Sequence, residues 1–158
     1  MGIGDVLASE MTSFTDEETG REVVRFTGAR ANSYPLYYFV PSHTSDGRYV
    51  VFHSERSGWL QLYRLDTNTG EMVQLTAGWA VWCEYRLRGI FNHLSALNQA
   101  RGEVYYFQDE GLFCSDVTGP DRVGLGNRQV LNLPGRIPVG QTGFSPDGRH
   151  FAFIHADA

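Results

Sequence analysis

The chain has 158 residues, of which 42% are hydrophobic and 20% are charged, a composition typical of a globular protein rather than a disordered one. Its formal net charge is -5, and all 13 of its basic residues are arginines, which are scattered along the sequence. These properties argue against a nucleic-acid partner, and the lack of lysine excludes chemistry that needs a lysine base or Schiff base in this chain.

The first residues, MGIGDVLASEMTS, do not resemble a secretory signal peptide, because they have no basic start and carry Asp5 and Glu10 where an apolar run is needed. No stretch approaches the roughly 20 apolar residues that a transmembrane helix requires. We therefore expect a cytoplasmic protein without a membrane contact. The two cysteines, Cys83 and Cys114, fit no CxxC spacing and are expected to be free thiols.

The first predicted strand lies at about 22–27, inside the stretch SFTDEETGREVVRFT at 13–27. This stretch matches LDTNTGEMVQLT at 65–76, which is the second half of a longer unit. The chain is therefore expected to open with the outer part of a repeat, and 22–27 is expected to be the closing outer strand of a ring.

A complete unit follows at about 36–76 and contains SDGRYVVF and then LYRLDTNTG. A second copy at about 95–133 contains ARGEVYYF and then LFCSDVTG, and the start of a third at about 141–155 contains PDGRHFAF. Aligned on Gly47, Gly102 and Gly148, the three copies are 55 and 46 residues apart. Three copies in the same order indicate a repeat protein.

Each unit consists of short runs rich in valine, tyrosine and phenylalanine, separated by Asp-Gly or Thr-Gly turns that suit hairpins. A period of about 40 to 50 residues with about four such strands is typical of a β-propeller blade. We predict an all-β fold, a partial β-propeller of about three blades of four-stranded antiparallel sheets. The alternative is a β-sandwich whose internal similarity is accidental.

Because a closed ring needs about four to eight blades, the chain is expected to be a piece of a propeller. Its open blade edges would then favour self-association. In a blade, alternate connections lie on opposite faces of the ring. The four Gly-containing turns are expected on one face: Asp46-Gly47, Thr69-Gly70, Thr118-Gly119 and Asp147-Gly148.

Ligand-binding residues are expected on the opposite face. There, Arg56 and Trp59 form a cluster with His53 and Glu55 that suits a sugar acid, unless the loop is merely solvated and Trp59 packs on a neighbouring strand. His155 is a further candidate, because the ends of inner strands line the channel of a propeller.

The long connector between the two complete units supplies a second group of candidates, Arg86, Arg88 and His93. Arginine forks match carboxylates bidentately, so these side chains suit an anionic sugar. The alternative is an irregular insert whose aromatic residues cap the core. The chain has no HExxH, GxSxG, P-loop or dinucleotide motif, which leaves a self-contained hydrolase without support.

The succession of TDEETGREVVRFT, YPLYYFVPSHTSDGRYVVFHSE and LYRLDTNTGEMVQLTAG resembles the amino-terminal part of the oligogalacturonate lyase family, intracellular seven-bladed propellers that act on pectin fragments. The resemblance covers 13–78 well and 95–155 at the level of the repeat. It implies a carbon–oxygen lyase that acts on oligogalacturonate or a similar acidic oligosaccharide. In such a reaction a base removes the proton next to a uronate carboxylate, while manganese and arginine neutralise the developing charge.

No position of this chain matches the family's metal ligands or base. The manganese ligands are therefore expected outside the chain, and the chain alone is expected to be inactive. A weaker similarity to TolB-type propellers leaves a second interpretation open, a propeller fragment that serves as a protein-interaction module. A third interpretation is the propeller gate of a peptidase.

Overall fold

The computed structural model describes residues 1–28, 31–78, 83–86, 90–119 and 126–157, with 83–86 and 90–93 described by their backbone alone. The described residues form fifteen β-strands and contain no helix, so none of their segments is a helix that could cross a membrane. The predicted all-β fold is confirmed.

Five antiparallel strands form the first sheet, here called blade 1. In order across the sheet they are β1 (Val6–Leu7), β7 (Met72–Gln74), β6 (Gln61–Asp66), β5 (Tyr49–Ser54) and β4 (Ser33–Pro35). Strand β1 covers the outer edge of β7, since Val6 lies opposite Val73 and the amide of Gln74 donates to the carbonyl of Asp5 at 3.0 Å.

Four antiparallel strands form the second sheet, blade 2, in the order β10 (Ser95–Asn98), β11 (Glu103–Gln108), β12 (Gly111–Asp116) and β13 (Arg128–Asn132). The remaining strands form three hairpins: β2 (Thr12–Thr15) with β3 (Glu22–Arg25), β8 (Cys83–Arg86) with β9 (Ile90–His93), and β14 (Arg136–Phe144) with β15 (Phe151–Asp157). The predicted units at 36–76 and 95–133 overlap the two blades, and these boundaries stay a prediction.

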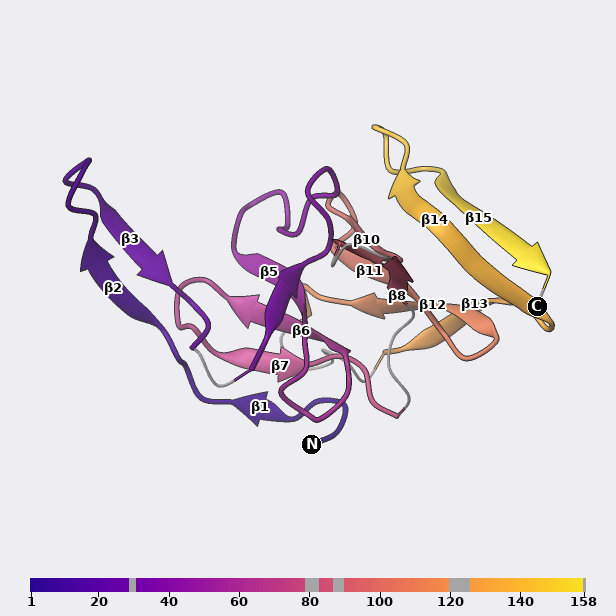
Figure 1. The fold of residues 1–158 in the computed structure, drawn as a ribbon, viewed down its shortest axis with the longest axis horizontal. Coiled ribbons are helices and arrows are strands. Elements are labelled where there is room, and N and C mark those ends of the chain that lie inside the picture. The colour runs from indigo at the N-terminus through magenta and orange to yellow at the C-terminus, as the bar shows by residue number, and fades with distance from the viewer. Residues whose placement is uncertain (29–30, 79–82, 87–89, 120–125, 158) are drawn as a thin grey trace.

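The sheets succeed one another along an arc, from the β2–β3 hairpin through blade 1 and blade 2 to the β14–β15 hairpin (Figure 1). The predicted partial propeller is confirmed, and the described residues do not close a ring. Segment 22–27, expected to be a closing strand, contains β3, which pairs with β2 in a separate sheet.

Both faces of blade 2 are apolar because this blade is packed between blade 1 and the last hairpin. Val51 and Leu62 of blade 1 pack against Val104 and Tyr106 of blade 2. The other face of blade 2 packs on the last hairpin, where Phe107 contacts two phenylalanines of β15 and Tyr105 contacts Phe144 of β14. Tyr106 is only 2% exposed, and burial of a side chain of this size stabilises the fold by about 2 to 3 kcal/mol.

The inner hairpins of blade 1 and of the third unit have the same turn, bond for bond. Thr44 Oγ1 donates to Asp46 Oδ1 at 2.5 Å, and the amide of Arg48 donates to that oxygen at 3.1 Å. Ser145 Oγ likewise donates to Asp147 Oδ1 at 2.5 Å, and the amide of Arg149 donates to that oxygen at 3.0 Å. These hydrogen bonds lower the pKa of both carboxyl groups. The turn is therefore a property of the repeated sequence.

The β2–β3 hairpin and the β6–β7 hairpin also have a common turn. The amide of Gly20 donates to the carbonyl of Asp16 at 2.8 Å, and the amide of Gly70 donates to that of Asp66 at 2.7 Å. The strand register is the same as well, because Phe14 lies opposite Val23 and its counterpart in blade 1 lies opposite Val73. The first hairpin is therefore the outer half of a blade.

Blade 2 differs from the alignment based on glycines. Tyr49 lies opposite Asp66 and Glu103 lies opposite Asp116, so β11 is offset from β5 by 54 residues rather than the 55 of the glycine alignment. Phe52 therefore corresponds to Tyr106, and not to Phe107 as in the glycine alignment. A slip of one residue exchanges the two faces of a strand, so the sequence alignment assigned the side chains of β11 to the wrong neighbours.

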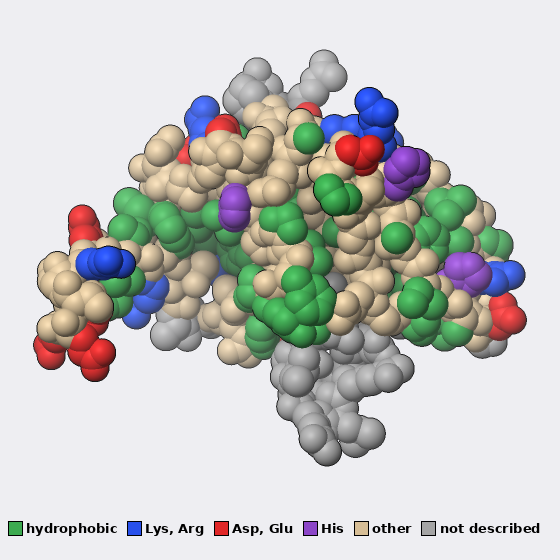
Figure 2. All heavy atoms as spheres, turned by 90° about the horizontal axis from the view of Figure 1, so that it is seen from above, with side chains coloured by type: hydrophobic (Ala, Val, Ile, Leu, Met, Phe, Trp, Pro, Cys, Tyr) green, Lys and Arg blue, Asp and Glu red, His purple; other side chains and the backbone are tan. Residues whose placement is uncertain are grey.

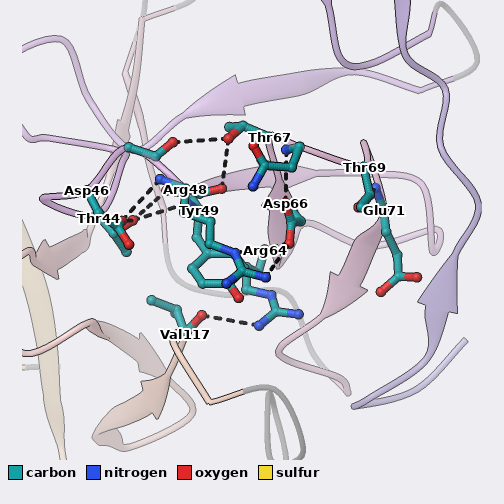
Figure 3. A network of polar contacts seen from close by, with 12 residues as sticks. Thr44, Asp46, Arg48, Tyr49, Arg64, Asp66, Thr67, Thr69, Glu71 and Val117 are labelled. Carbon is teal, nitrogen blue, oxygen red and sulfur yellow. Dashed lines mark hydrogen bonds and ion pairs between the residues drawn. The ribbon is translucent and has the colours of Figure 1, made fainter.

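The four Gly-containing turns lie at one end of the blades, as predicted. Thr67 Oγ1 donates to the carbonyl of Gly47 at 3.1 Å, which joins the two turns of blade 1 (Figure 3). Asn98 Nδ2 donates to the carbonyl of Gly148 at 2.8 Å, and the amide of Val117 donates to the carbonyl of Gly102 at 2.8 Å. Arg56 and Trp59 follow the opposite end of β5.

One buried arginine links the two blades at this turn end. Arg64 is 6% exposed, its guanidinium lies 4.5 Å from the ring centroid of Tyr49, and its Nη1 donates to the carbonyl of Val117 at 3.3 Å (Figure 3). Burial lowers the pKa of this guanidinium.

The free thiol of Cys114 is buried too, and burial raises its pKa to about 11, which suppresses its reactivity.

Candidate functional site

The innermost strand of blade 1 is interrupted by a turn. β4 pairs with the end of β5, and residues 42–44 pair with its beginning, where the amide of Val51 donates to the carbonyl of Ser42 at 2.7 Å. Between them the chain leaves the sheet and turns back at residues 37–40, here called the aromatic turn. Leu36 is fully buried and anchors this excursion.

The aromatic turn exposes its rings to solvent. Tyr38 is 78% exposed and Phe39 is 56% exposed, although their ring centroids lie only 4.0 Å apart. Gln141 Nε2 donates to the hydroxyl of Tyr37 at 3.2 Å, which connects the turn to β14 of the third unit. Exposed aromatic rings at the inner edge of a propeller are available to a ligand.

A hollow of about 610 Å³ lies between the aromatic turn and the turn-side ends of β10 and β14. We call it the inner-strand hollow. Its size is that of a small-molecule site. Figure 2 views the turn end of the molecule, and hydrophobic side chains gather near the middle of this face. The main lining side chains are those of Phe39, Leu97, Asn98, Gln99, Thr142, Phe144 and Ser145.

The lining combines aromatic rings with hydroxyl and amide groups. Thr142 is 7% exposed, and its buried Oγ1 has no hydrogen-bond partner among the described residues, whereas Asn98 Nδ2 donates to the carbonyl of Gly148. A buried hydroxyl without a partner costs about 1 to 3 kcal/mol, so a ligand that bonds to it would be favoured. No charged side chain lines the hollow, but Arg101 and Arg149 lie in the turns beside it and are exposed.

The described residues do not fit a manganese ion. Among the described ranges, no group of three or more His, Cys, Asp or Glu side chains could hold a metal. His53 is fully buried with Nε2 3.2 Å from Ser95 Oγ, and Nδ1 of His155 lies 3.0 Å from Nη1 of Arg136. The hollow offers aromatic rings and hydroxyl and amide groups to a ligand. Among the described residues that line it, there is neither a base nor a cation.

Arg56, a predicted ligand-binding residue, is held inside blade 1. Its side chain is 7% exposed, and its Nη1 lies 3.0 Å from Glu10 Oε1. Its guanidinium also contacts Ser54 Oγ and Met72 Sδ, and it lies 5.4 Å from the ring centroid of Tyr63. A uronate would have to displace Glu10 to reach this arginine, and ligand binding by Arg56 stays a prediction.

The other residues predicted near Arg56 are spread around it. Trp59 is 54% exposed, and Glu55 is exposed and accepts a hydrogen bond from Asn32 Nδ2 at 2.7 Å. Arg88 lies outside the described residues. Arg86 is the last residue of β8 and His93 is the last residue of β9, but only their backbone is described. A ligand-binding role for Trp59, Arg86, Arg88 and His93 stays a prediction.

The hollow was not predicted from the sequence, because three segments far apart in the chain form it. One signal for part of it is the run YPLYYFVP at 34–41, in which four aromatic residues stand between and beside two prolines. Proline cannot donate to a sheet, so such a run is typical of a strand that is interrupted.

The chain has the fold of oligogalacturonate lyase structures. An oligogalacturonate lyase in complex with manganese superposes with a TM-score of 0.72 and 23% identity, over 94% of this chain and 36% of that one. An oligogalacturonate lyase from Vibrio parahaemolyticus superposes with a TM-score of 0.75 and 20% identity, over 98% of this chain and 38% of that one. Neither a family model nor a curated protein matches the chain.

The similarity to these lyases establishes the fold that the sequence motifs predicted. The chain spans little more than a third of their length, 36% and 38%. A TolB structure from Agrobacterium tumefaciens superposes with a TM-score of 0.49, which is too low to support an inference about this chain.

Proposed function

We propose that the chain binds an acidic oligosaccharide of the oligogalacturonate type in the inner-strand hollow. The observation that carries the proposal is the hollow itself, whose aromatic and hydroxyl lining lies at the inner edge of a fold similar to oligogalacturonate lyase. The exposed ring of Phe39 would contact the apolar face of a sugar, and Thr142 Oγ1 would bond to a sugar hydroxyl.

The carboxylates of the sugar would be bound at the rim by exposed arginines. Arg101 and Arg149 extend from neighbouring turns, and the side chain of Arg149 is 79% exposed. Charge-assisted hydrogen bonds from guanidinium to carboxylate are about twice as strong as neutral ones. The hollow would thus supply contacts to the ring, and the two turns would supply selectivity for acidic sugars.

We expect the double variant Arg101→Gln, Arg149→Gln to bind trigalacturonate at least about tenfold more weakly in titration calorimetry, which corresponds to about 1.4 kcal/mol. A neutral oligosaccharide prepared by reducing the carboxylates should bind both proteins equally. Arg21→Gln is the matched control, since this exposed arginine lies in the β2–β3 turn. Loss of affinity in Trp59→Ala but not in the double variant would place the ligand on the opposite face instead.

Replacement of Thr142 by valine separates binding from stability. Valine has nearly the same shape and removes a buried hydroxyl without a partner, so we expect the free energy of unfolding to rise by about 1 kcal/mol. The affinity for trigalacturonate should fall in the same variant. A stability that falls in urea titrations would show that the hydroxyl has a partner within the protein.

We further propose that lyase chemistry of this fold needs groups beyond the described residues. Removal of a proton next to a uronate carboxylate requires a base and a cation together, and the described side chains bring no such pair into the hollow. The 158-residue chain should release no unsaturated uronate from oligogalacturonate, with or without added manganese. We also propose a cytoplasmic location, on the sequence pattern alone.

A further inference from the structure

Two hairpins of the chain are complementary halves of a blade. The β2–β3 hairpin has the turn and the register of β6–β7, the outer half of blade 1. The β14–β15 hairpin has the turn of the inner half of blade 1, and Phe144 lies opposite Phe151 as His43 lies opposite Val50. Neither hairpin has the other half beside it among the described residues.

Both hairpins expose an open strand edge and apolar side chains. Among the described residues, β15 is paired only through the edge that faces β14, and β2 only through the edge that faces β3. Phe14, Val24 and Ile154 are 54%, 41% and 60% exposed, and Val23 is 38% exposed. An open edge that carries apolar residues is a template for another strand.

We propose that β15 of one copy of this chain pairs antiparallel with β2 of a second copy, so that β14, β15, β2 and β3 form one four-stranded blade across the interface. The pairing of β5 with β6 in blade 1 fixes the register. Transferred to the two hairpins, it sets Ala152 opposite Phe14 and Ile154 opposite Thr12. Phe153 keeps its contact with Phe107 of its own blade 2.

A recess on blade 1 fits the face that this composite blade would present. The recess has a volume of about 200 Å³ and is lined by Phe26, Tyr34, Val50, Phe52 and Leu65 among others, with no charged side chain. It opens on the face of blade 1 that is turned away from blade 2. Ile154 is equivalent in the repeat to His53. The side chain of His53 faces the next blade, where its Nε2 lies 3.2 Å from Ser95 Oγ. In the composite blade Ile154 would therefore face this recess.

Two copies close the ring. Each copy supplies an outer half, two complete blades and an inner half, which together make three blades. Two copies related by a two-fold axis make six blades, within the range of about four to eight that closed propellers have. Both β15–β2 contacts are then identical, and no half-blade edge is left open.

The chain should accordingly sediment and scatter light as a dimer, with twice the 17.7 kDa of the monomer. Ile154→Lys should shift the mass to that of the monomer, because lysine at this position would enter an apolar recess. The matched control Ile154→Leu should keep the dimer, because leucine is apolar and of similar size. A folded wild-type monomer would overturn the proposal, as would an Ile154→Lys variant that stays a dimer.

Disulfide cross-linking tests the register. In a Cys83→Ser background, Phe14→Cys with Ala152→Cys should give a covalent dimer under oxidation, and mixing the two single variants should give a dimer with one disulfide. The matched control, Ser13→Cys with Ala152→Cys, puts the thiols on opposite faces and should stay uncross-linked. A ladder of larger species would overturn the closed ring, and equal cross-linking of the control would overturn the register. If a strand of another protein is the natural partner, the pure chain will remain monomeric.

Discussion

Replacing Arg56 by methionine is expected to lower the free energy of unfolding by about 2 to 3 kcal/mol. The substitution leaves Glu10 without its cation, removes one of the hydrogen bonds to Ser54 Oγ, and removes the guanidinium that lies over Phe52 and Tyr63. Glu10 is 30% exposed and keeps the hydrogen bond from the amide of Gly28, so the loss should be smaller than for a fully buried pair. For a domain of this size the loss is a large part of the total stability.

Arg48→Met is the matched control. Arg48 is also ion-paired, to Asp66 at 3.3 Å, and it also lies over a ring, that of Tyr49, but its side chain is 53% exposed. Exposed pairs contribute under about 1 kcal/mol, so the control should unfold close to the wild-type urea midpoint. If both variants lose equally little, the contact of Arg56 with Glu10 does not stabilise the blade, and the arginine becomes available to a ligand.

Gly102→Ala is expected to cost about 3 kcal/mol, from two causes that add. Gly102 has a φ of 64°, which favours glycine, and a Cβ at this position would lie 2.1 Å from Cγ2 and 3.1 Å from Cβ of Thr118. Rotation of the Thr118 side chain cannot relieve the contact between the new Cβ of residue 102 and the Cβ of Thr118. The turn must therefore move and strain the hydrogen bond from the amide of Val117 to Gly102.

Gly135→Ala separates the two causes. Gly135 also has a φ of 64°, but nothing lies within 4 Å of the added Cβ. This variant should lose only the roughly 1 kcal/mol that the backbone conformation costs. Thermal melting of both variants beside the wild type measures the difference. Equal losses would mean that the turn of blade 2 adapts freely, and that its contact with Thr118 adds no stability.

The parts of the fold that the sequence predicted are those that local chemistry determines. Thr44 with Asp46, and Ser145 with Asp147, form the same turn because the side chains bond to their own backbone within a few residues. The second copy misled the alignment because its turn holds Asn98 and Ala100 where the others hold Ser or Thr and Asp, and its glycine stands one residue closer to the following strand.

The site was harder to predict because its contacts are long-range. Glu10 is 46 residues from Arg56, and no local pattern announces that these two side chains meet inside a blade. Thr142 is unremarkable in sequence, and only the packing of three inner strands leaves its hydroxyl without a partner. Arginine content and exposed loops thus predicted an acidic ligand, whereas the structure shows which arginines are exposed, Arg101 and Arg149, and which is buried, Arg56.

Strand β1 has a consequence for how the chain folds during synthesis. Val6 and Leu7 pair with residues of β7, some 65 positions later, so the ribosome must deliver most of blade 1 before the first strand has a partner. The β2–β3 hairpin, by contrast, pairs residues 7 to 13 positions apart and can form as soon as both strands are synthesised. At elongation rates of about 5 to 20 residues per second, the first strand therefore waits several seconds as an unpaired segment. Pulse-labelled amide exchange on stalled nascent chains should find β1 unprotected until β7 has left the exit tunnel.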